Sequence, residues 1–277
     1  MTALIRPVFA LGITEFRIAL RNRWVTITVA LMALFALVLS AAGSAPTGDV
    51  GVDALSVTVA SLTSLGVYLV PLMALLMSFD AVAGEVERGT LSLTLTYPVS
   101  RSGILMGKFA AHLVVLTIAV GVGYALAAAA ALATDPGASA GLPALLRLFW
   151  SSILLGAVFL AVGYTLSAIA RRPGAAAGLA IGVWLALVVL YDLGLLAAVV
   201  ADGGGAFTNR ALPWLLLANP ADAFRLYNLA ASEATAAASG LGGAAQTIPA
   251  VHALISVLLW PLAAFGLAVA ALRRVTP

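Results

Sequence analysis

Six long runs of apolar residues constrain this chain more than any other feature of its sequence. Each run has about 20 or more residues and almost no charge, which is the length that an α-helix needs to cross a bilayer. Only 9% of the residues are charged, far below the roughly 25% of soluble domains, and the mean hydropathy is +1.12. The sequence therefore predicts an all-α integral membrane protein with six transmembrane helices, at Trp24–Gly43, Val57–Phe79, Phe109–Ala133, Leu148–Ala170, Ala175–Ala201 and Val251–Leu272.

The segments between these runs are short, apart from one rich in Gly and Ala at residues 202–249. We therefore expect a single transmembrane domain over residues 1–277, without a separate soluble domain. Lys and Arg are retained on the cytoplasmic side of membranes. With both termini inside, 11 of the 14 Lys and Arg residues lie on that side. This split predicts two cytoplasmic termini, and anionic lipid accounts for the basic character without any nucleic acid.

Residues 1–23 precede the first run and have helical amphipathic spacing. Their apolar side chains recur at Phe9, Ile13, Phe16 and Leu20, while Arg17 lies on another side. The spacing predicts an interfacial helix on the inner surface of the membrane. Two alternatives are a simple extension of the first span and a cleavable signal peptide, for which the charged region before the run is too long.

The loop between the second and third runs, residues 84–103, concentrates charge in a chain that otherwise has little. Its pattern EVERGTLSLTL begins with Glu85 and Glu87, where a helix N-terminus favours acids, and continues with alternating leucines. The pattern predicts one short cytoplasmic helix over Glu85–Leu95. Mixed charged and apolar residues suit docking to a soluble partner, and a solvated loop that only anchors two spans is the alternative.

Sites for catalysis and for metals are missing from the sequence. The chain has no Cys, and its two histidines, His112 and His252, fall near opposite faces of the membrane. The segment Gly103–Phe109 imitates a phosphate-binding loop but is one residue short and ends in Phe. Met73 and Met77 lie one helical turn apart, and packing explains them better than Cu(I) binding. We expect no catalytic residue, no metal site and no cofactor on this chain.

Two features lie inside the fifth run. Asp192 is an acid at membrane depth, which is costly unless it faces a polar interior or a partner, so a transport role and a structural hydrogen bond to Tyr191 or a neighbouring helix are both open. Glycines at four-residue spacing let another helix approach closely, either within one subunit or across a dimer. They are Gly174, Gly178 and Gly182.

The long segment 202–249 contains two short elements too small to span a membrane, Leu212–Pro220 and Asp222–Leu229. They predict interfacial or re-entrant helices at the outer end of the bundle. An extracytoplasmic partner could contact this surface, and its candidate residues are Trp214, Asn219, Asp222, Arg225 and Tyr227.

The layout of an interfacial helix, six spans, a charged E-x-E-x-G-T-L element after the second span and short helices before the sixth resembles the ABC-2 permeases of ATP-binding-cassette transporters, which have the type V exporter architecture. The resemblance implies that the loop carries a coupling helix, which docks on a separate ATPase subunit holding ATP and Mg. The implied ATPase-coupling residues are Glu85, Glu87, Arg88, Gly89, Thr90, Leu91 and Arg101.

A narrower resemblance extends over nearly the whole chain, to the NosY-like permeases of the nitrous-oxide-reductase maturation system. It is carried by RNRW at 21–24, FDAVAGEVERGTLSLTLTYPVSR at 79–101, GKF at 107–109, LYDL at 190–193 and LPWLLLANPADAFRLYNL at 212–229. It implies a permease homodimer in a bacterial inner membrane, with NosF-like ATPases and a NosD-like periplasmic β-helix protein. A copper chaperone works alongside, and the complex supports assembly of the reductase's copper-sulfur centre.

The resemblance leads to one main hypothesis. The chain would transmit ATP-driven motion outward, either exporting a sulfur-containing species or remodelling the periplasmic partner. Two alternatives remain: a generic ABC-2 exporter of a lipid or amphiphile, and a membrane scaffold that transports nothing.

Overall fold

The computed structural model describes residues 53–94, 96, 100–229 and 249–275, and near the N-terminus residues 12–14, 16–18, 26–27, 30–31, 33–35 and 37–38. Within this part, five helices are long and apolar enough to cross a membrane: Ala54–Glu87, Arg101–Thr134, Gly137–Ala170, Pro173–Asp202 and Ala250–Arg273. They coincide with five of the six predicted runs. The first run, Trp24–Gly43, and the predicted interfacial helix lie mostly outside the described residues, and their described positions are helical.

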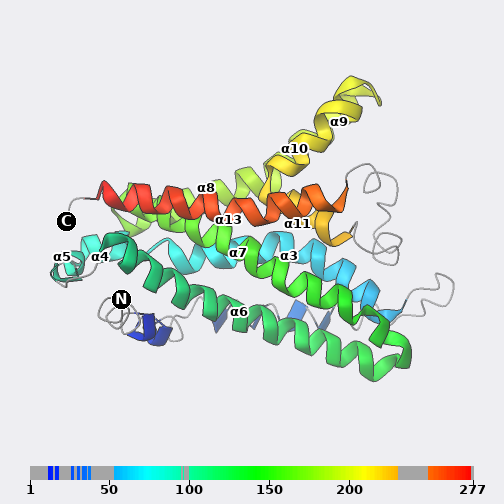
Figure 1. The fold of residues 1–277 in the computed structure, drawn as a ribbon, viewed down its shortest axis with the longest axis horizontal. Coiled ribbons are helices and arrows are strands. Elements are labelled where there is room, and N and C mark those ends of the chain that lie inside the picture. Colours follow the sequence, from blue (N-terminus) through cyan, green and yellow to red (C-terminus); the bar gives the residue numbers. More distant parts are fainter. Residues whose placement is uncertain are drawn as a thin grey trace.

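Long helices of the described part lie side by side and form a bundle (Figure 1). Helix α7 (Leu142–Ala170) packs most extensively, with α3 (Ala54–Ser78) and α13 (Ala250–Arg273) against it, and α6 (Arg101–Thr134) contacts α7 and α3. The core therefore lies around α7, whose fully buried side chains include Phe159.

Capping side chains fix the end of the bundle opposite the short helices α4 (Ala83–Glu87) and α5 (Thr90–Thr94). The carboxylate of Asp53 accepts hydrogen bonds from the amide and the hydroxyl of Ser56, at 2.9 and 2.6 Å, and so caps α3. Asp135 accepts from the amides of Ala54 at 3.0 Å and Gly137 at 2.7 Å, and these bonds hold its pKa below the ordinary value. Asp135 thereby ties α3 to the 3₁₀ turn η1 (Pro136–Gly141).

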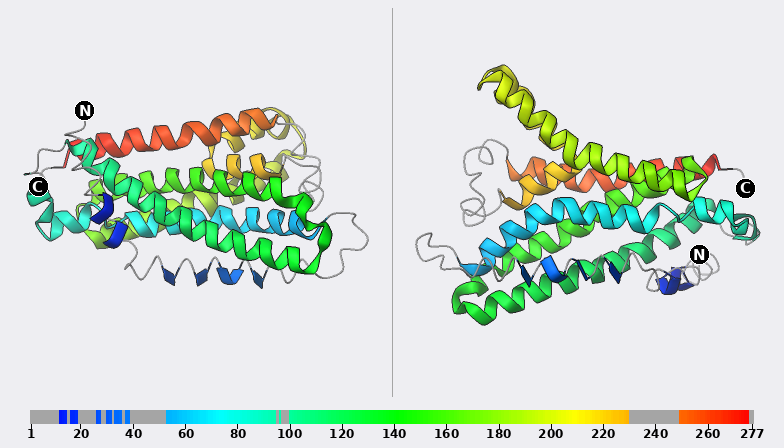
Figure 2. Two further views of the ribbon diagram at one scale, coloured as in Figure 1. Left: turned by 60° about the horizontal axis from the view of Figure 1, so that its bottom comes forward. Right: turned by 180° about the vertical axis from the view of Figure 1, so that it is seen from behind.

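The fourth apolar helix leaves the bundle along its length. It consists of α8 (Pro173–Trp184), a π-helical segment η2 (Leu185–Leu190) and α9 (Tyr191–Asp202). Helix α9 projects away from the other helices, and the chain returns through η3 (Phe207–Ala211) and α10 (Leu212–Ala218) (Figures 1 and 2). Helix α11 (Pro220–Leu229) then packs against α13, α3 and α7. The two predicted short helices before the last span are thus present, and the second is buried among the long helices.

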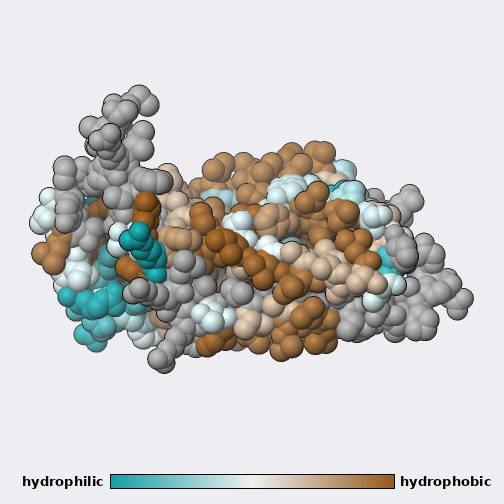
Figure 3. All heavy atoms as spheres, turned by 90° about the horizontal axis from the view of Figure 1, so that it is seen from below, coloured by the Kyte–Doolittle hydropathy of each residue, from teal (hydrophilic) through white to brown (hydrophobic). Residues whose placement is uncertain are grey.

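The surface agrees with a membrane setting. Apolar residues cover the middle of the face in Figure 3, and hydrophilic residues gather at the end of the molecule that carries α4 and α5. Large side chains such as Leu262 and Leu267, 72% and 62% exposed, stand on α13 without cover in the single chain. Lipid tails or a second subunit would cover such a surface at no cost in apolar hydration.

Close helix approach depends on glycine at Gly163 in α7. A β-carbon at this position would overlap the Ser78 hydroxyl of α3, whose oxygen is already committed to the Ala74 carbonyl at 2.7 Å. Ser78 is fully buried, so it has no free space into which to move. The crossing of α3 and α7 therefore requires a residue without a side chain here.

We expect Gly163→Ala to lower the stability of the purified protein by about 1–3 kcal/mol, because the added methyl group overpacks the crossing. Gly266→Ala is the matched control, since a β-carbon on Gly266 of α13 meets no atom within 4 Å. Thermal unfolding in detergent measures both variants. An unchanged melting temperature in Gly163→Ala would contradict the proposed close approach.

Candidate functional site

Two short helices follow α3 and form what we name the α4–α5 element: α4 (Ala83–Glu87), the link Arg88–Gly89, and α5 (Thr90–Thr94). The prediction of one continuous helix over Glu85–Leu95 is wrong at the link, while residues 95 and 97–99 lie outside the described part. Gly89 has φ +69°, a left-handed conformation that glycine adopts without strain and that ends α4.

The start of α4 is tied to the last turn of α7. The amides of Val82 and Ala83 donate to the hydroxyl of Ser167 on α7, at 3.0 and 2.9 Å. Ser167 is fully buried. The first amides of a helix have no partner within it. Ser167 therefore caps α4, although it lies more than 80 positions away in the sequence.

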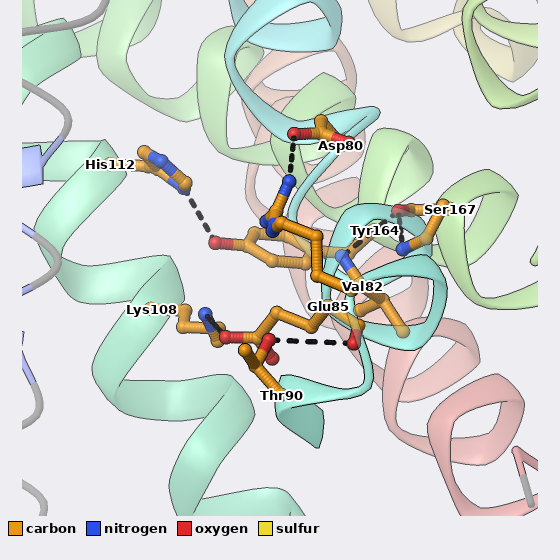
Figure 4. A network of polar contacts seen from close by, with 10 residues as sticks. Asp80, Val82, Glu85, Thr90, Lys108, His112, Tyr164 and Ser167 are labelled. Atoms are coloured by element: carbon orange, nitrogen blue, oxygen red, sulfur yellow. Dashed lines mark hydrogen bonds and ion pairs between the residues drawn. The ribbon is translucent and has the colours of Figure 1, made fainter. Parts of the chain in front are cut away.

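A buried ion pair joins the element to α6. The ammonium of Lys108 lies 2.8 Å from Glu85 Oε1, and the two side chains are only 4% and 15% exposed (Figure 4). Charges buried to this degree are tolerated because each neutralises the other, and removing either partner leaves an unpaired charge. Glu85 therefore points into the fold and fixes the position of α4.

The remaining predicted coupling residues divide between the surface and the interior. Glu87, Arg88 and Gly89 are exposed, and Arg88 lies 3.6 Å from Asp80 in a pair open to solvent. Leu91 is 3% exposed and belongs to the core, whereas Leu93, two residues on, is 65% exposed. Among the described residues of the element, Glu87, Arg88, Gly89, Ser92 and Leu93 are exposed and open to a partner.

Thr90 makes a hydrogen bond within the α4–α5 element, and Arg101 lies outside the element at the start of α6. The Thr90 hydroxyl donates to the carbonyl of Glu85 at 3.4 Å. The Arg101 guanidinium donates to the carbonyls of Leu272 at 3.1 Å and of Val275, at the end of α13. A cation at this place satisfies carbonyls that have no partner within the helix. Arg101 thus joins the start of α6 to the end of the last long helix.

Sequence reasoning missed the inner residues of this site, Lys108, Ser167, His112 and Tyr164. His112 follows Lys108 by one helical turn, and its Nδ1 lies 2.6 Å from the Tyr164 hydroxyl of α7 (Figure 4). Lys108 is the single lysine of the chain. A lone lysine at the edge of an apolar run, four residues before a histidine, was the available signal.

The acid in the predicted fifth span has a partner that the sequence did not identify. Asp192 Oδ2 lies 2.7 Å from the Arg225 guanidinium of α11, and the same guanidinium lies 3.2 Å from Asp222 Oδ1. The Tyr191 hydroxyl, one of the anticipated partners, donates instead to the carbonyl of Leu215 at 2.8 Å. We name Asp192, Asp222 and Arg225 the ionic cluster.

Most of the residues predicted to contact an extracytoplasmic partner lie within the fold. Asn219 and Asp222 are 2% and 1% exposed, Arg225 belongs to the ionic cluster, and Tyr227 meets Trp150 edge to face with ring centroids 5.3 Å apart. Trp214 on α10 is 68% exposed. Of this set, Trp214 is the side chain most open to direct contact, and the partner contact itself stays a prediction.

The three glycines of α8 face open space. A β-carbon at Gly174, Gly178 or Gly182 meets no atom within 4 Å. Within the described residues, the glycines therefore do not serve helix packing inside one chain. The alternative of a contact with a second chain remains.

Comparison with known proteins agrees with this architecture. The model of the ABC-2 family transporter protein matches residues 9–275. A probable ABC transporter permease protein NosY from Pseudomonas aeruginosa is 44% identical over 271 residues, covering 96% of this chain and 98% of that protein. The probable NosY permease of Stutzerimonas stutzeri is 42% identical over 269 residues, covering 94% and 95%. The chain belongs to the ABC-2 family of transporter proteins and is a multi-pass membrane permease.

Proposed function

We propose that this chain is the membrane subunit of an ABC transporter that supports maturation of the copper-sulfur centre of nitrous oxide reductase. Its similarity to two NosY permeases over nearly its full length supports this assignment. ATP hydrolysis takes place on a separate, NosF-like ATPase subunit, and a NosD-like periplasmic protein receives the motion. The chain lies in the bacterial inner membrane with both termini in the cytoplasm.

The buried Glu85–Lys108 pair is the observation that carries the coupling mechanism. The ATPase docks on the exposed Glu87, Arg88, Gly89 and Leu93 of the α4–α5 element. Motion of the element then passes through Glu85 to α6 and through Ser167 to α7. Because both connections are buried, the element moves together with these helices and does not swing freely.

Two copies of the chain pair through the glycine face of α8. Small residues let helix backbones approach closely, and packing drives helix association within lipid. In the span that contains α8, only 11% of the residues in its apolar stretch are buried in the single chain, against 61% in the spans of α3 and α7. A second subunit on this face would give α8 the packing that the single chain does not provide.

Mutations can test separately the exposed residues that dock the ATPase and the buried Glu85–Lys108 pair. We expect Glu87→Ala/Leu93→Ala to weaken co-purification with the ATPase by about 30-fold, the loss typical of an interface hot spot. Glu85→Gln removes the charge facing Lys108, so we expect it to retain ATPase binding but to lower copper loading of the reductase per ATP hydrolysed. Binding, ATPase rate and copper content are the measurements.

Leu146→Ala is the control for the docking variant, because Leu146 is also 65% exposed but lies near the start of α7. Equal ATPase binding by wild type and by Glu87→Ala/Leu93→Ala would show that the charged loop only anchors two spans. A Glu85→Gln variant with wild-type copper loading would place transmission elsewhere.

A partner ATPase that binds ATP without hydrolysing it distinguishes transmission from scaffolding. We expect the complex to assemble with this ATPase and the reductase to lack its copper-sulfur centre, because the permease must be driven through its conformations. Copper content of the reductase is the readout. Full loading would support the scaffold alternative.

The glycine face predicts a specific defect in pairing. We expect Gly178→Leu to shift the purified permease from dimer to monomer while its melting temperature as a monomer is unchanged, since the side chain points into open space in the single chain. Gly266→Leu introduces the same side chain at an open glycine on α13 and serves as control. Mass photometry in detergent reports the ratio. A dimer that survives Gly178→Leu and is lost in Gly266→Leu would move the interface to α13.

A further inference from the structure

The ionic cluster holds more negative than positive charge. Arg225 contacts Asp192 of α9 at 2.7 Å and Asp222 of its own helix at 3.2 Å. The Asp222 side chain is 1% exposed, and those of Arg225 and Asp192 are 23% and 24% exposed. Two ionised carboxylates on one guanidinium would leave a net charge of about −1 in a site largely removed from water, which is costly.

One oxygen of the cluster has an environment that suits a proton. Asp222 Oδ2 is buried and accepts no hydrogen bond from the residues that the structure describes. The Asp192 and Asp222 carboxyls are held on the same guanidinium, that of Arg225. Two carboxylate oxygens are both acceptors and repel each other unless one of them carries a hydrogen.

The helices around the cluster offer it little other compensation. Tyr68 of α3 lies near Arg225, and the Tyr191 hydroxyl of α9 is committed to the Leu215 carbonyl. Helix α7 contributes Ser151, which bonds Asn228 of α11 at 2.9 Å, and Trp150, which meets Tyr227. From α13, the Ser256 hydroxyl donates to the Leu217 carbonyl at 2.6 Å. Arg225 is thus the one cation facing the two acids within the described part of the chain.

We propose that the ionic cluster is a proton-binding site in which Asp222 carries the proton. The protonated Asp222 carboxyl donates a hydrogen bond to the carboxylate of Asp192. The bound proton leaves Asp192 and Arg225 as a neutral pair and converts a repulsion between two helices into a hydrogen bond. When α9 separates from α11, the Asp222 O–H bond breaks, the proton passes to water, and the new carboxylate is neutralised by Arg225.

The proton couples pH to the position of the projecting helix. Asp192 is the second residue of α9, and Asp222 lies in α11, which at ten residues is too short to span the membrane. Separation of the two helices is linked to proton release, so protonation favours the closed arrangement seen here. This inference goes beyond the proposed function and stands whatever the transporter moves.

The electrostatics of Asp222 agree with this arrangement. Burial first, and then the neighbouring Asp192, raise the pKa of the Asp222 carboxyl from 3.8 to about 8. A group whose pKa is higher in the folded than in the unfolded protein stabilises the fold fully below its unfolded value. That contribution is lost as the pH rises through about 8.

Infrared spectroscopy of the full-length permease in lipid nanodiscs tests the site, because a protonated carboxyl has a carbonyl band that a carboxylate lacks. We expect wild type to show this band at about pH 6, within the range where ordinary carboxyls are ionised, and to lose it toward about pH 10. Asp222→Asn should lack the band. Asp192→Asn should lower the midpoint at which the band is lost, because Asp222 then faces Arg225 without a competing carboxylate and ionises more readily.

Asp135→Asn is the control, since Asp135 is a partly exposed capping acid held ionised by backbone amides, and it should leave the band unchanged. Absence of the band from wild type at about pH 6 would overturn the proposal without any variant being needed. A band that persists in folded Asp222→Asn, or a wild-type midpoint unaffected by Asp192→Asn, would overturn it equally.

Discussion

The buried ion pair between Glu85 and Lys108 is the interaction on which the arrangement of the α4–α5 element depends. An apolar contact in its place would hold α4 against α6 without fixing its register. An ion pair at 2.8 Å permits one arrangement, because any shift leaves a charge unpaired in an environment that water scarcely reaches. The Ser167 hydroxyl adds a second fixed point at the start of α4. The α4–α5 element is thus attached at two points, to Lys108 on α6 and to Ser167 on α7.

Polar and apolar contacts both hold the long helices together. Polar contacts join elements at both ends, through Glu85–Lys108 at one end and the bond from the Ala54 amide to Asp135 at the other. Between these ends the helices also pack small and apolar residues closely. Hydroxyls within α3, such as Thr63 and Ser78, donate to carbonyls of their own helix. These hydroxyls therefore need no partner on another helix.

The sequence predicted the long helices well, because apolar runs of bilayer length have few other structures. It placed the helix ends less well. Helix α6 begins at Arg101 and not at Phe109, since Ser100 caps it and Arg101 reaches the carbonyls at the end of α13. An apolar run marks only the part of a helix that lies inside the bilayer. The helix itself continues beyond the bilayer until a cap ends it. The break at Gly89 shows the same limit, because the leucines that follow suggested a continuous helix.

Pairings between distant residues lay beyond the sequence altogether. Asp192 and Arg225 were both singled out, but for separate roles, because nothing in a single sequence joins positions 33 residues apart. The single lysine went unused for the same reason. The sequence did indicate that Asp192 has a partner, because an acid inside an apolar run is costly without one. That requirement was met within the chain, by a helix that the sequence predicted to lie at the surface.

The π-helical segment η2 explains how Asp192 reaches that partner. A π-turn adds a residue to the helix, which rotates everything after it by about 100° relative to a continuous α-helix. Tyr191 and Asp192 come directly after η2, and both bond to the returning segment, at Leu215 and Arg225. Inside η2, the carbonyl of Leu187 accepts from the side-chain amide of Asn219 at 2.7 Å. The widened turn thus supplies both an acceptor and the rotation that aims Asp192 at α11. The motif around residues 212–229 is specific because its polar residues meet this one irregular turn.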